Sequence, residues 1–359
     1  MAAIVVCGLF LLPATATACY YAALTLIGRL PRRVRTANPP LPALTVLIPA
    51  HNEQTGLPTT LASVFAADYP ADRLRVLVIA DNCTDDTAAV ARRAGADVRE
   101  RHDPNHRGKG SALAFGLNHL ASADAVLILD ADCTIDPQLL MRVGDRLTDS
   151  EAVQVAVVSR ADTTNPGGYV AAVGAAIDHG VAAGADRLGW GVPLRGTGMA
   201  FRRSLLNRCP WTTSGVTEDA EYAARLDQAG VRVRLIPDAA VRCHAPDQLG
   251  NFLNQRKRWR AALHVPQSRV RSLTTSKPLV LAHLMLAVAV TAAVTPQYLG
   301  WAGVTLALTL GVYAQGIACV GRPRIGLFAR SIGVTARLGW LTLGGFWQRE
   351  REWHCTPRS

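Results

Sequence analysis

The sequence predicts an α/β domain with a mostly parallel central sheet, held between membrane-spanning helices at both ends of the chain. Three observations predict it. Apolar runs typical of buried strands alternate with helix-like segments from about Pro40 to Val241. Several of these runs end in polar residues, at the edge where such sheets bind ligands. Long stretches without charged side chains flank the region on both sides.

The composition narrows the class of protein. Hydrophobic residues make up 49% of the 359 residues, and the mean hydropathy is +0.15, which is high for a wholly soluble chain. The net charge of +11 raises the question of nucleic acid. However, much of the basic charge flanks the apolar stretches, where it attracts anionic headgroups, and no nucleic-acid motif accompanies it. We expect membrane lipids as partners, and no nucleic acid.

The N-terminal stretch is predicted to be an uncleaved membrane anchor. Residues 1–28 carry no charge and are long enough to cross a bilayer, and a basic linker follows at residues 29–43. A cleaved signal peptide, cut after Ala16-Thr17-Ala18, is the competing interpretation. No Lys or Arg precedes the apolar run, which continues to Ile27, so an anchor with its arginines in the cytoplasm is favoured.

The C-terminal part predicts further membrane contact. A basic interfacial segment at residues 263–277 leads into an uncharged stretch, 278–321, whose Thr295-Pro296-Gln297 predicts a turn between two spans. Arg330 and Arg337 indicate an interfacial or re-entrant helix within residues 322–359, because charge at the bilayer centre is costly. A third span over Ile325–Trp347 stays open. We expect a multi-pass protein of the cell membrane with its central domain in the cytoplasm.

The central region, residues 44–262, divides into recognisable elements. The predicted strands cover 44–49, 74–80 and 125–129, and the predicted helices cover 57–67 and 110–120. Thr84 is the expected N-cap of an Ala-rich helix after the second strand. The cysteines show no metal-ligand spacing. Free thiols are therefore expected at the four cysteines of the central region, which are Cys83, Cys133, Cys209 and Cys243.

Asp130 and Asp132 form the most informative motif. They follow the apolar run Ala125–Leu129, and on an extended backbone residues i and i+2 point the same way. Mg²⁺ and Mn²⁺ prefer carboxylate oxygens and complete their shell with substrate phosphates. The pair predicts a metal–diphosphate site with Asp132 as the more direct ligand, although a solvated strand-end turn explains the pair alone equally well.

Polar residues at other strand ends extend this site. Glu53 follows the first strand, and Asp81 follows the second, where it can accept a hydrogen bond from a base N–H. Lys109 lies in a glycine-containing basic turn before a helix, a place that favours anions. The turn lacks the full P-loop pattern, so nucleotide hydrolysis is not expected. Helix capping by Asp81 and a solvated turn at Lys109 are the simpler alternatives.

Two further clusters point to sugar chemistry. Asp219 is the candidate general base within an acidic helix start, with Glu218 and Glu221 as its rivals. A favourable contact with the helix dipole explains the acidic cluster equally simply. Gln255, Arg258 and Trp259 fall within about one helical turn. An arginine can bind a diphosphate, and an indole can stack on a sugar ring. The simpler alternative is that these residues belong to an aromatic and basic belt at the membrane interface.

In this order the motifs resemble the membrane-bound branch of the family 2 inverting glycosyltransferases, which includes cellulose, chitin, hyaluronan and poly-N-acetylglucosamine synthases and transferases of bacterial exopolysaccharide operons. The resemblance implies a GT-A fold, a UDP-sugar donor, a glycan or lipid-linked acceptor, and Mg²⁺ or Mn²⁺. It matches Asp81 to the base-binding aspartate, Asp130 and Asp132 to D-x-D, and Asp219 to the base of T-E-D. Diphosphate and acceptor binding then involve Gly196, Thr197, Gly198, Glu218, Gln255, Arg258 and Trp259.

Two departures from the family pattern matter. The usual second aspartate after the second strand is Asn82 here, and the C-terminal membrane part is short for a polymer channel. The chain is therefore expected either to transfer a single sugar or to rely on an export partner. A non-catalytic binding subunit of an export complex is the rival interpretation, but the retained Asp130, Asp132, Asp219 and Trp259 argue against it.

Overall fold

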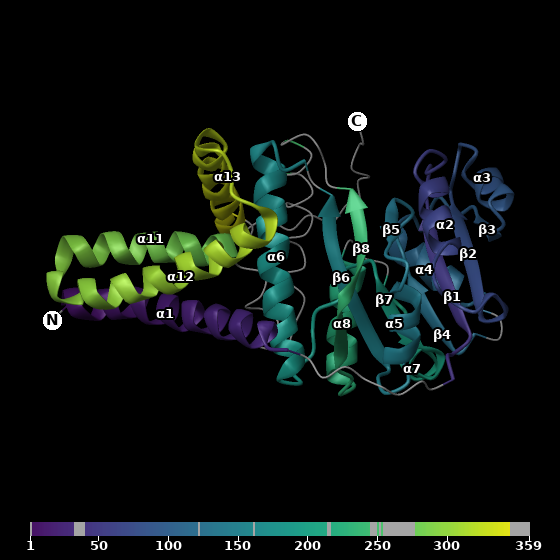
Figure 1. The fold of residues 1–359 in the computed structure, drawn as a ribbon, viewed down its shortest axis with the longest axis horizontal. Helices are drawn as coiled ribbons and strands as arrows, with labels where there is room; N and C mark the ends of the chain where they lie inside the picture. Colours follow the sequence, from purple (N-terminus) through teal and green to yellow (C-terminus); the bar gives the residue numbers. More distant parts are fainter. Residues whose placement is uncertain are drawn as a thin grey trace.

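The protein is described here by a computed structural model, which describes residues 2–31, 40–120, 123–160, 162–213, 217–244, 250, 253 and 277–344. Figure 1 shows a sheet-containing domain at one side and a group of long helices at the other. Gln255, Arg258, Trp259 and the segment 263–277, apart from Lys277, lie outside the described residues, so their predicted roles stay predictions.

Eight strands form one sheet in the order β3-β2-β1-β4-β7-β6-β8-β5. Their bounds are β1 Leu44–Ala50, β2 Leu74–Asp81, β3 Asp97–Arg101, β4 Ala125–Ile128, β5 Cys133–Ile135, β6 Ala152–Arg160, β7 Met199–Arg202 and β8 Val233–His244. Strands β3, β2, β1 and β4 are parallel, as expected. The other half is mixed, because β7 is antiparallel to β4 and β6, and β5 is antiparallel to β8.

The mixed half of the sheet has a simple cause. The chain re-enters the sheet through Gly198, whose N–H bonds to the carbonyl of Ile128 at the carboxyl end of β4, at 2.9 Å. A strand that starts at this end runs in the opposite direction to β4. The expectation of a mostly parallel sheet is therefore correct for the first half and incomplete for the second.

Helices cover both faces of the sheet, which is why β1, β2 and β4 read as continuous apolar runs. On β1, Val46 and Ile48 face one core and Leu47 faces the other. The first core is closed by α2 Leu57–Phe65, α3 Thr87–Arg93 and α5 Leu139–Arg146. The second is closed by α4 Lys109–Leu117, α6 Pro166–Arg187, α7 Arg203–Arg208 and α8 Glu218–Gln228.

The N-cap expectation at Thr84 is wrong. Helix α3 begins at Thr87, and the Asp85 carboxylate accepts a hydrogen bond from the Thr87 N–H at 3.0 Å. Thr84 instead pairs with Asn52, which accepts its N–H at 2.8 Å. A carboxylate accepts more strongly than a hydroxyl, so Asp85 holds the start of the helix.

Three long helices lie side by side in Figure 1: α1 Ala2–Arg29, α11 Lys277–Val294 and α12 Leu299–Val320. A short turn at Pro296–Tyr298 joins the last two, close to where the sequence predicts it. Two of the described helical stretches, Cys7–Arg29 and Pro296–Val320, are long and apolar enough to cross a membrane.

Helix α6 connects these helices to the sheet domain. In Figure 1 it crosses the ends of α1 and α12 steeply, and its other side contacts β6 and β8. Glycines allow the close approach, since a Cβ on Gly184 would lie 2.1 Å from the carbonyl oxygen of Leu24 in α1. Helix α13, Ile325–Gly344, packs on α6 and α11 and leaves Ile325 and Trp340 highly exposed.

Candidate functional site

The candidate site lies at the carboxyl edge of β1, β2 and β4, where three parallel strands end together. The register pairs Ala50 with Ala80, so the turns after β1 and β2 are neighbours. Asn52 and Asn82 in these turns have φ values of 54° and 50°. This left-handed conformation suits asparagine better than most residues. Both turns use this conformation at one asparagine, and the Thr84 N–H donates to Asn52 Oδ1 at 2.8 Å, which joins the two turns.

Asp81, the last residue of β2, is fixed by a buried arginine. Its Oδ1 accepts from Arg101 Nη1 at 2.6 Å and from Asn82 Nδ2 at 3.1 Å, and the residue is only 5% exposed. Within the described part of the chain, Oδ2 of Asp81 accepts no hydrogen bond. One carboxylate oxygen is thus committed to the protein and the other remains for a ligand.

The hydrogen bonds of Asn82 explain why an asparagine stands where the family pattern has an aspartate. Its Oδ1 accepts from the backbone N–H of Asp103 at 2.8 Å, while its Nδ2 donates to Asp81 and to the Asp103 carbonyl. An aspartate has no N–H to donate at this point. The amide therefore joins β2 to the loop after β3, and it does so beside the Asp81 carboxylate.

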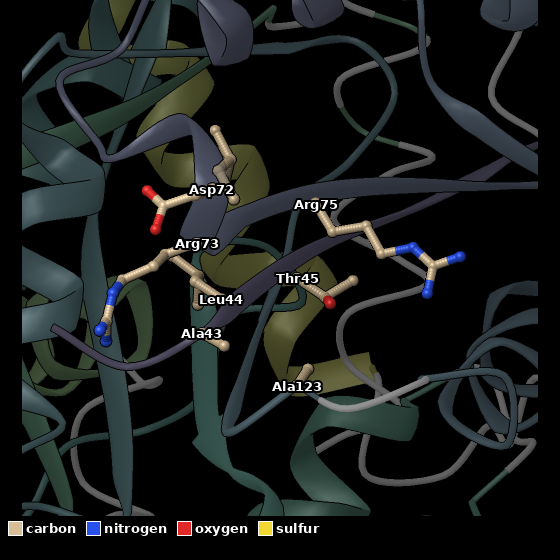
Figure 2. A pocket seen from close by; sticks show the side chains of 8 residues that line it. Ala43, Leu44, Thr45, Asp72, Arg73, Arg75 and Ala123 are labelled. Atoms are coloured by element: carbon tan, nitrogen blue, oxygen red, sulfur yellow. The ribbon is translucent and has the colours of Figure 1, made fainter.

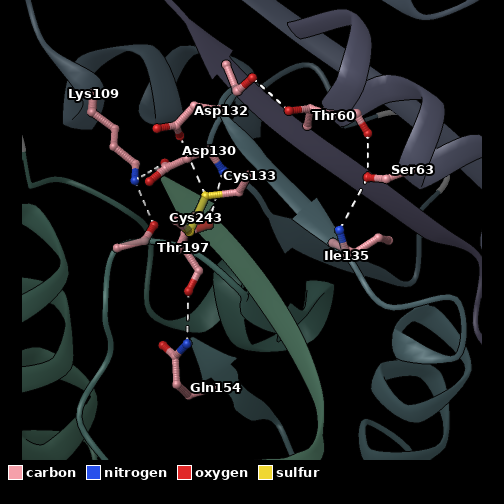
Figure 3. The surroundings of a disulfide bond; sticks show 12 residues. Thr60, Ser63, Lys109, Asp130, Asp132, Cys133, Ile135, Gln154, Thr197 and Cys243 are labelled. Atoms are coloured by element: carbon pink, nitrogen blue, oxygen red, sulfur yellow. Dashed lines mark hydrogen bonds and ion pairs between the residues drawn. A yellow bond between two sulfur atoms is a disulfide. The ribbon is translucent and has the colours of Figure 1, made fainter. Parts of the chain in front are cut away.

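Lys109 connects Asp130 to the loop that begins at Gly196. Its ammonium pairs with Oδ1 of Asp130 and donates to the carbonyl of Gly196 at 2.7 Å (Figure 3). A Cβ on Gly196 would lie 3.5 Å from Lys109 Nζ and 3.7 Å from Asp219 Oδ2. Gly196, with φ of 77°, therefore lies close to both the lysine and the candidate base.

Burial and the neighbouring charges shift the pKa values of Lys109, Glu218 and Asp219. Burial raises the pKa of Glu218 to about 7; Lys109 opposes the shift and the charge of Asp219 adds to it. Burial also raises the pKa of Asp219, again against Lys109. For Lys109 itself burial acts downward, but the charges of Asp130, Glu218 and Asp219 outweigh it and raise its pKa. The lysine stays charged beside carboxylates that accept protons readily.

Gln154 of β6, a residue that no sequence pattern singles out, holds the loop from Gly196 to Gly198. Its amide nitrogen donates to the carbonyl of Thr197 at 2.8 Å, and its Oε1 accepts the N–H of Arg195 at 2.9 Å. Thr197 in turn accepts the backbone N–H of Asp130 through Oγ1 at 3.1 Å. Only the contact between a buried amide and a loop distant in sequence reveals this role.

Asp130 and Asp132 follow β4 at the carboxyl edge of the parallel strands. Together with Cys133 they offer ligand atoms within 4.8 Å of one another. In this structure Cys133 forms a disulfide with Cys243 of β8 (Figure 3). The expectation of free thiols is therefore wrong for this pair: the two residues face each other across adjacent antiparallel strands. The two carboxylates remain as candidate metal ligands.

The remaining predicted residues are placed as follows. The N–H of Glu53 donates to Thr87 Oγ1 at 2.8 Å, so this residue links the β1 turn to α3. Glu221 lies 3.5 Å from Thr217 Oγ1, at the start of its own helix. Asp219, by contrast, is a near neighbour of Lys109, whose pKa its charge raises.

A pocket of about 170 Å³ lies at the other end of the strands. It is lined by the starts of β1 and β2, including Thr45, Asp72 and Arg75 (Figure 2). The amino ends of parallel strands are opposite the edge that carries Asp81 and Asp130. We assign no function to this pocket.

Comparison with known proteins agrees with the fold and the motifs. The family described as "Glycosyltransferase like family 2" matches residues 40–262. An N-acetylglucosaminyltransferase of Rhizobium meliloti is 30% identical over 61% of this chain and 55% of its own length. One of Rhizobium leguminosarum is 29% identical over 67% and 60%. The chain thus spans little more than half the length of these relatives.

A solved structure shows the same architecture. A mannosyltransferase from Pyrobaculum calidifontis, in complex with GDP-Man and Mn²⁺, superposes with a TM-score of 0.63. The match covers 97% of this chain and 99% of the other, at 22% identity, so the shared feature is the GT-A fold together with its flanking helices. With more than half of its residues matched by the family, this chain belongs to the family 2 glycosyltransferases.

Proposed function

We propose that this protein transfers a sugar, with inversion, from a UDP-sugar to a glycan or lipid-linked acceptor at the cytoplasmic face of the cell membrane. The observation that carries the proposal is the convergence of Lys109, Asp130, Gly196 and Asp219 at one strand edge. This edge holds groups for a donor diphosphate and a base for an acceptor hydroxyl within the span of one sugar.

The uracil preference rests on Asp81. Arg101 and Asn82 occupy its Oδ1, so only Oδ2 is left for a nucleobase. Uracil presents one ring N–H to such an acceptor. Guanine presents a ring N–H and an amino group side by side, which a carboxylate binds best with both oxygens. The committed oxygen supports UDP-sugars over GDP-sugars.

Asp130 and Asp132 fit a divalent cation such as Mg²⁺ or Mn²⁺. Their donor set is carboxylate oxygen, which these hard ions prefer. Asp130 shares one oxygen with Lys109, which supports Asp132 as the more direct ligand. Such an ion, when bound, neutralises negative charge on the donor diphosphate.

Asp219 is the proposed general base. Its raised pKa and half-buried position suit a carboxylate that accepts a proton from a hydroxyl. The charge of Lys109 acts against this rise in pKa and favours the ionised carboxylate. The Gly196-Thr197-Gly198 loop lies between donor and acceptor positions, and Glu218 lies beside the base in the first turn of α8.

The acceptor assignment rests on the helices. Helix α6 contacts α1 and α12 on one side and the sheet strands β6 and β8 on the other. Helices α1 and α12 are long and apolar enough to cross a membrane, and with α11 beside them and α13 at the interface they would keep the site at a lipid surface. This arrangement supports a lipid-linked acceptor or a growing glycan, with an export partner where the product is a polymer.

Asp219→Asn tests the base in membranes that contain the full-length protein. We expect transfer from a labelled UDP-sugar to fall by about 10²–10⁴-fold. Asp227→Asn, the same change at the other end of α8, serves as the control and is expected to keep wild-type activity. Unchanged transfer by the Asp219 variant would overturn the assignment of the base, and absence of transfer by the wild type would favour a non-catalytic binding subunit.

A further inference from the structure

Gln154 stands out as a polar side chain in the core of the sheet. It is 1% exposed and lies on β6, with apolar neighbours at Val153 and Val155. A buried amide costs free energy unless its hydrogen bonds are made. Here they are made: Nε2 donates to the carbonyls of Thr197 and Val155 at 2.8 and 2.9 Å, and Oε1 accepts from Arg195 N–H at 2.9 Å.

Two of these bonds end on the loop that carries Gly196. They join Gln154 to the backbone on either side of Gly196, at Arg195 and at Thr197. Between the two, the Gly196 carbonyl accepts from Lys109. The position of that carbonyl, and hence of the lysine ammonium, follows from where Gln154 holds the loop.

Besides Gln154 and Lys109, the described contacts of the loop are the bond from the Asp130 N–H to Thr197 Oγ1 at 3.1 Å and backbone bonds of Gly198. Gly198 bonds to β4 and β6 through its backbone, at Ile128 and Val155. Its φ of 65°, like the 77° of Gly196, leaves the backbone intrinsically free to adopt other conformations. A loop with glycines at both ends needs hydrogen bonds from side chains to keep one conformation. Gln154 on β6 supplies such bonds.

We propose that Gln154 is a positioning residue for sugar transfer: it fixes the Gly196-Thr197-Gly198 loop so that Gly196 keeps its hydrogen bond with Lys109 and its place beside Asp219. Gln154 acts through the loop and does not touch the reacting atoms. The claim about transfer rests on the proposed function, whereas the claim about the loop does not.

Gln154→Met is the test variant, because it keeps the length of the side chain and removes its hydrogen bonds. Val153→Ala is the control: it lies next on the same strand, is fully buried, and packs into the opposite core without touching the loop. The control weakens the strand while leaving the loop's partners in place.

Hydrogen exchange tests the loop claim without any turnover. We expect the amides of residues 195–198 to exchange at least tenfold faster in Gln154→Met than in the wild type, and at the wild-type rate in Val153→Ala. Equal protection of this segment in all three proteins would overturn the proposal. This result is independent of whether the protein transfers a sugar.

Kinetics test the consequence for transfer. With the UDP-sugar that the wild type uses, we expect kcat of Gln154→Met to fall at least tenfold while the donor KM stays within about twofold, because Asp81 is held by other residues. Val153→Ala should keep both values. A Gln154→Met variant with the kcat of the control, or with a change in KM alone, would contradict a positioning role.

Discussion

Lys109, the first residue of α4, forms an ion pair with Asp130, two residues beyond the end of β4. The pair joins the helix that follows β3 to the strand next to β1, across the carboxyl edge of the parallel strands. The same ammonium bonds to the Gly196 carbonyl at 2.7 Å. One cation therefore connects the carboxylate proposed for the metal with the loop beside the proposed base.

Replacing Lys109 with Met should abolish most of the transfer. Without the ammonium, Asp130, Glu218 and Asp219 form an unbalanced acidic group that repels the donor diphosphate. We expect a loss of about 10²–10³-fold in kcat/KM. Arg107→Met, an exposed basic residue two positions earlier, is the matched control, and equal kinetics in the two variants would contradict the role of Lys109.

Arg101 should control the affinity for the nucleotide. Arg101→Met frees Oδ1 of Asp81 and removes the bonds that also hold Asp103 and the His106 carbonyl. We expect about a tenfold or larger increase in Kd for UDP, measured by calorimetry, since hydrogen bonds to charged groups contribute about 1.5–3 kcal/mol. Arg99→Met on the same strand should bind UDP like the wild type. An unchanged Kd in Arg101→Met would exclude Asp81 as the base contact.

Glu218 makes a pH-dependent contribution to stability. Its pKa is about 7 in the folded protein and near 4.5 when unfolded, so the folded state binds the extra proton between these values. Stability therefore falls as pH rises through this range. Glu218→Gln should be more stable than the wild type above pH 7, by about 2–3 kcal/mol, with the difference vanishing below about pH 4.5. Denaturant unfolding across pH measures this, and a difference that grows toward acid pH would contradict it.

The contact between α1 and α6 should depend on Gly184. Its Cβ position lies 2.1 Å from the Leu24 carbonyl oxygen, so Gly184→Ala forces the helices apart. We expect a lower melting temperature in detergent. Gly174→Ala on the same helix meets no atom within 4 Å and should be neutral or stabilising by up to about 1 kcal/mol. Equal melting of the two variants would refute the close packing.

Cys133 and Cys243 offer a test of the membrane orientation. The two strands bring their Cα atoms to 4.4 Å, so the disulfide forms readily in air. The cytoplasm keeps thiols reduced. We therefore expect both cysteines to react with maleimide in acid-quenched cells, and neither to react after aerobic purification. A disulfide already present in the quenched cells would contradict a cytoplasmic sheet domain.

The polar residues at the carboxyl edge of the strands could be predicted because short, local sequence patterns mark them. Apolar runs followed by Asp81 and Asp130 mark strand ends directly in the sequence, and Lys109 and Asp219 follow glycine and helix-start patterns. Gln154 and Arg101 carry no local signal, since each acts on residues distant in sequence. The Cys133–Cys243 bond was missed for a similar reason: it depends on the pairing of β5 with β8, which no spacing reveals.

A donor screen tests the central claim most directly. Full-length protein in membranes is incubated with a panel of UDP- and GDP-sugars and either Mg²⁺ or Mn²⁺, and both nucleotide release and product length are scored. The account predicts metal-dependent turnover of a UDP-sugar that is lost in Asp219→Asn and abolished by chelation. Turnover of GDP-sugars alone, or turnover that survives Asp219→Asn, would contradict it.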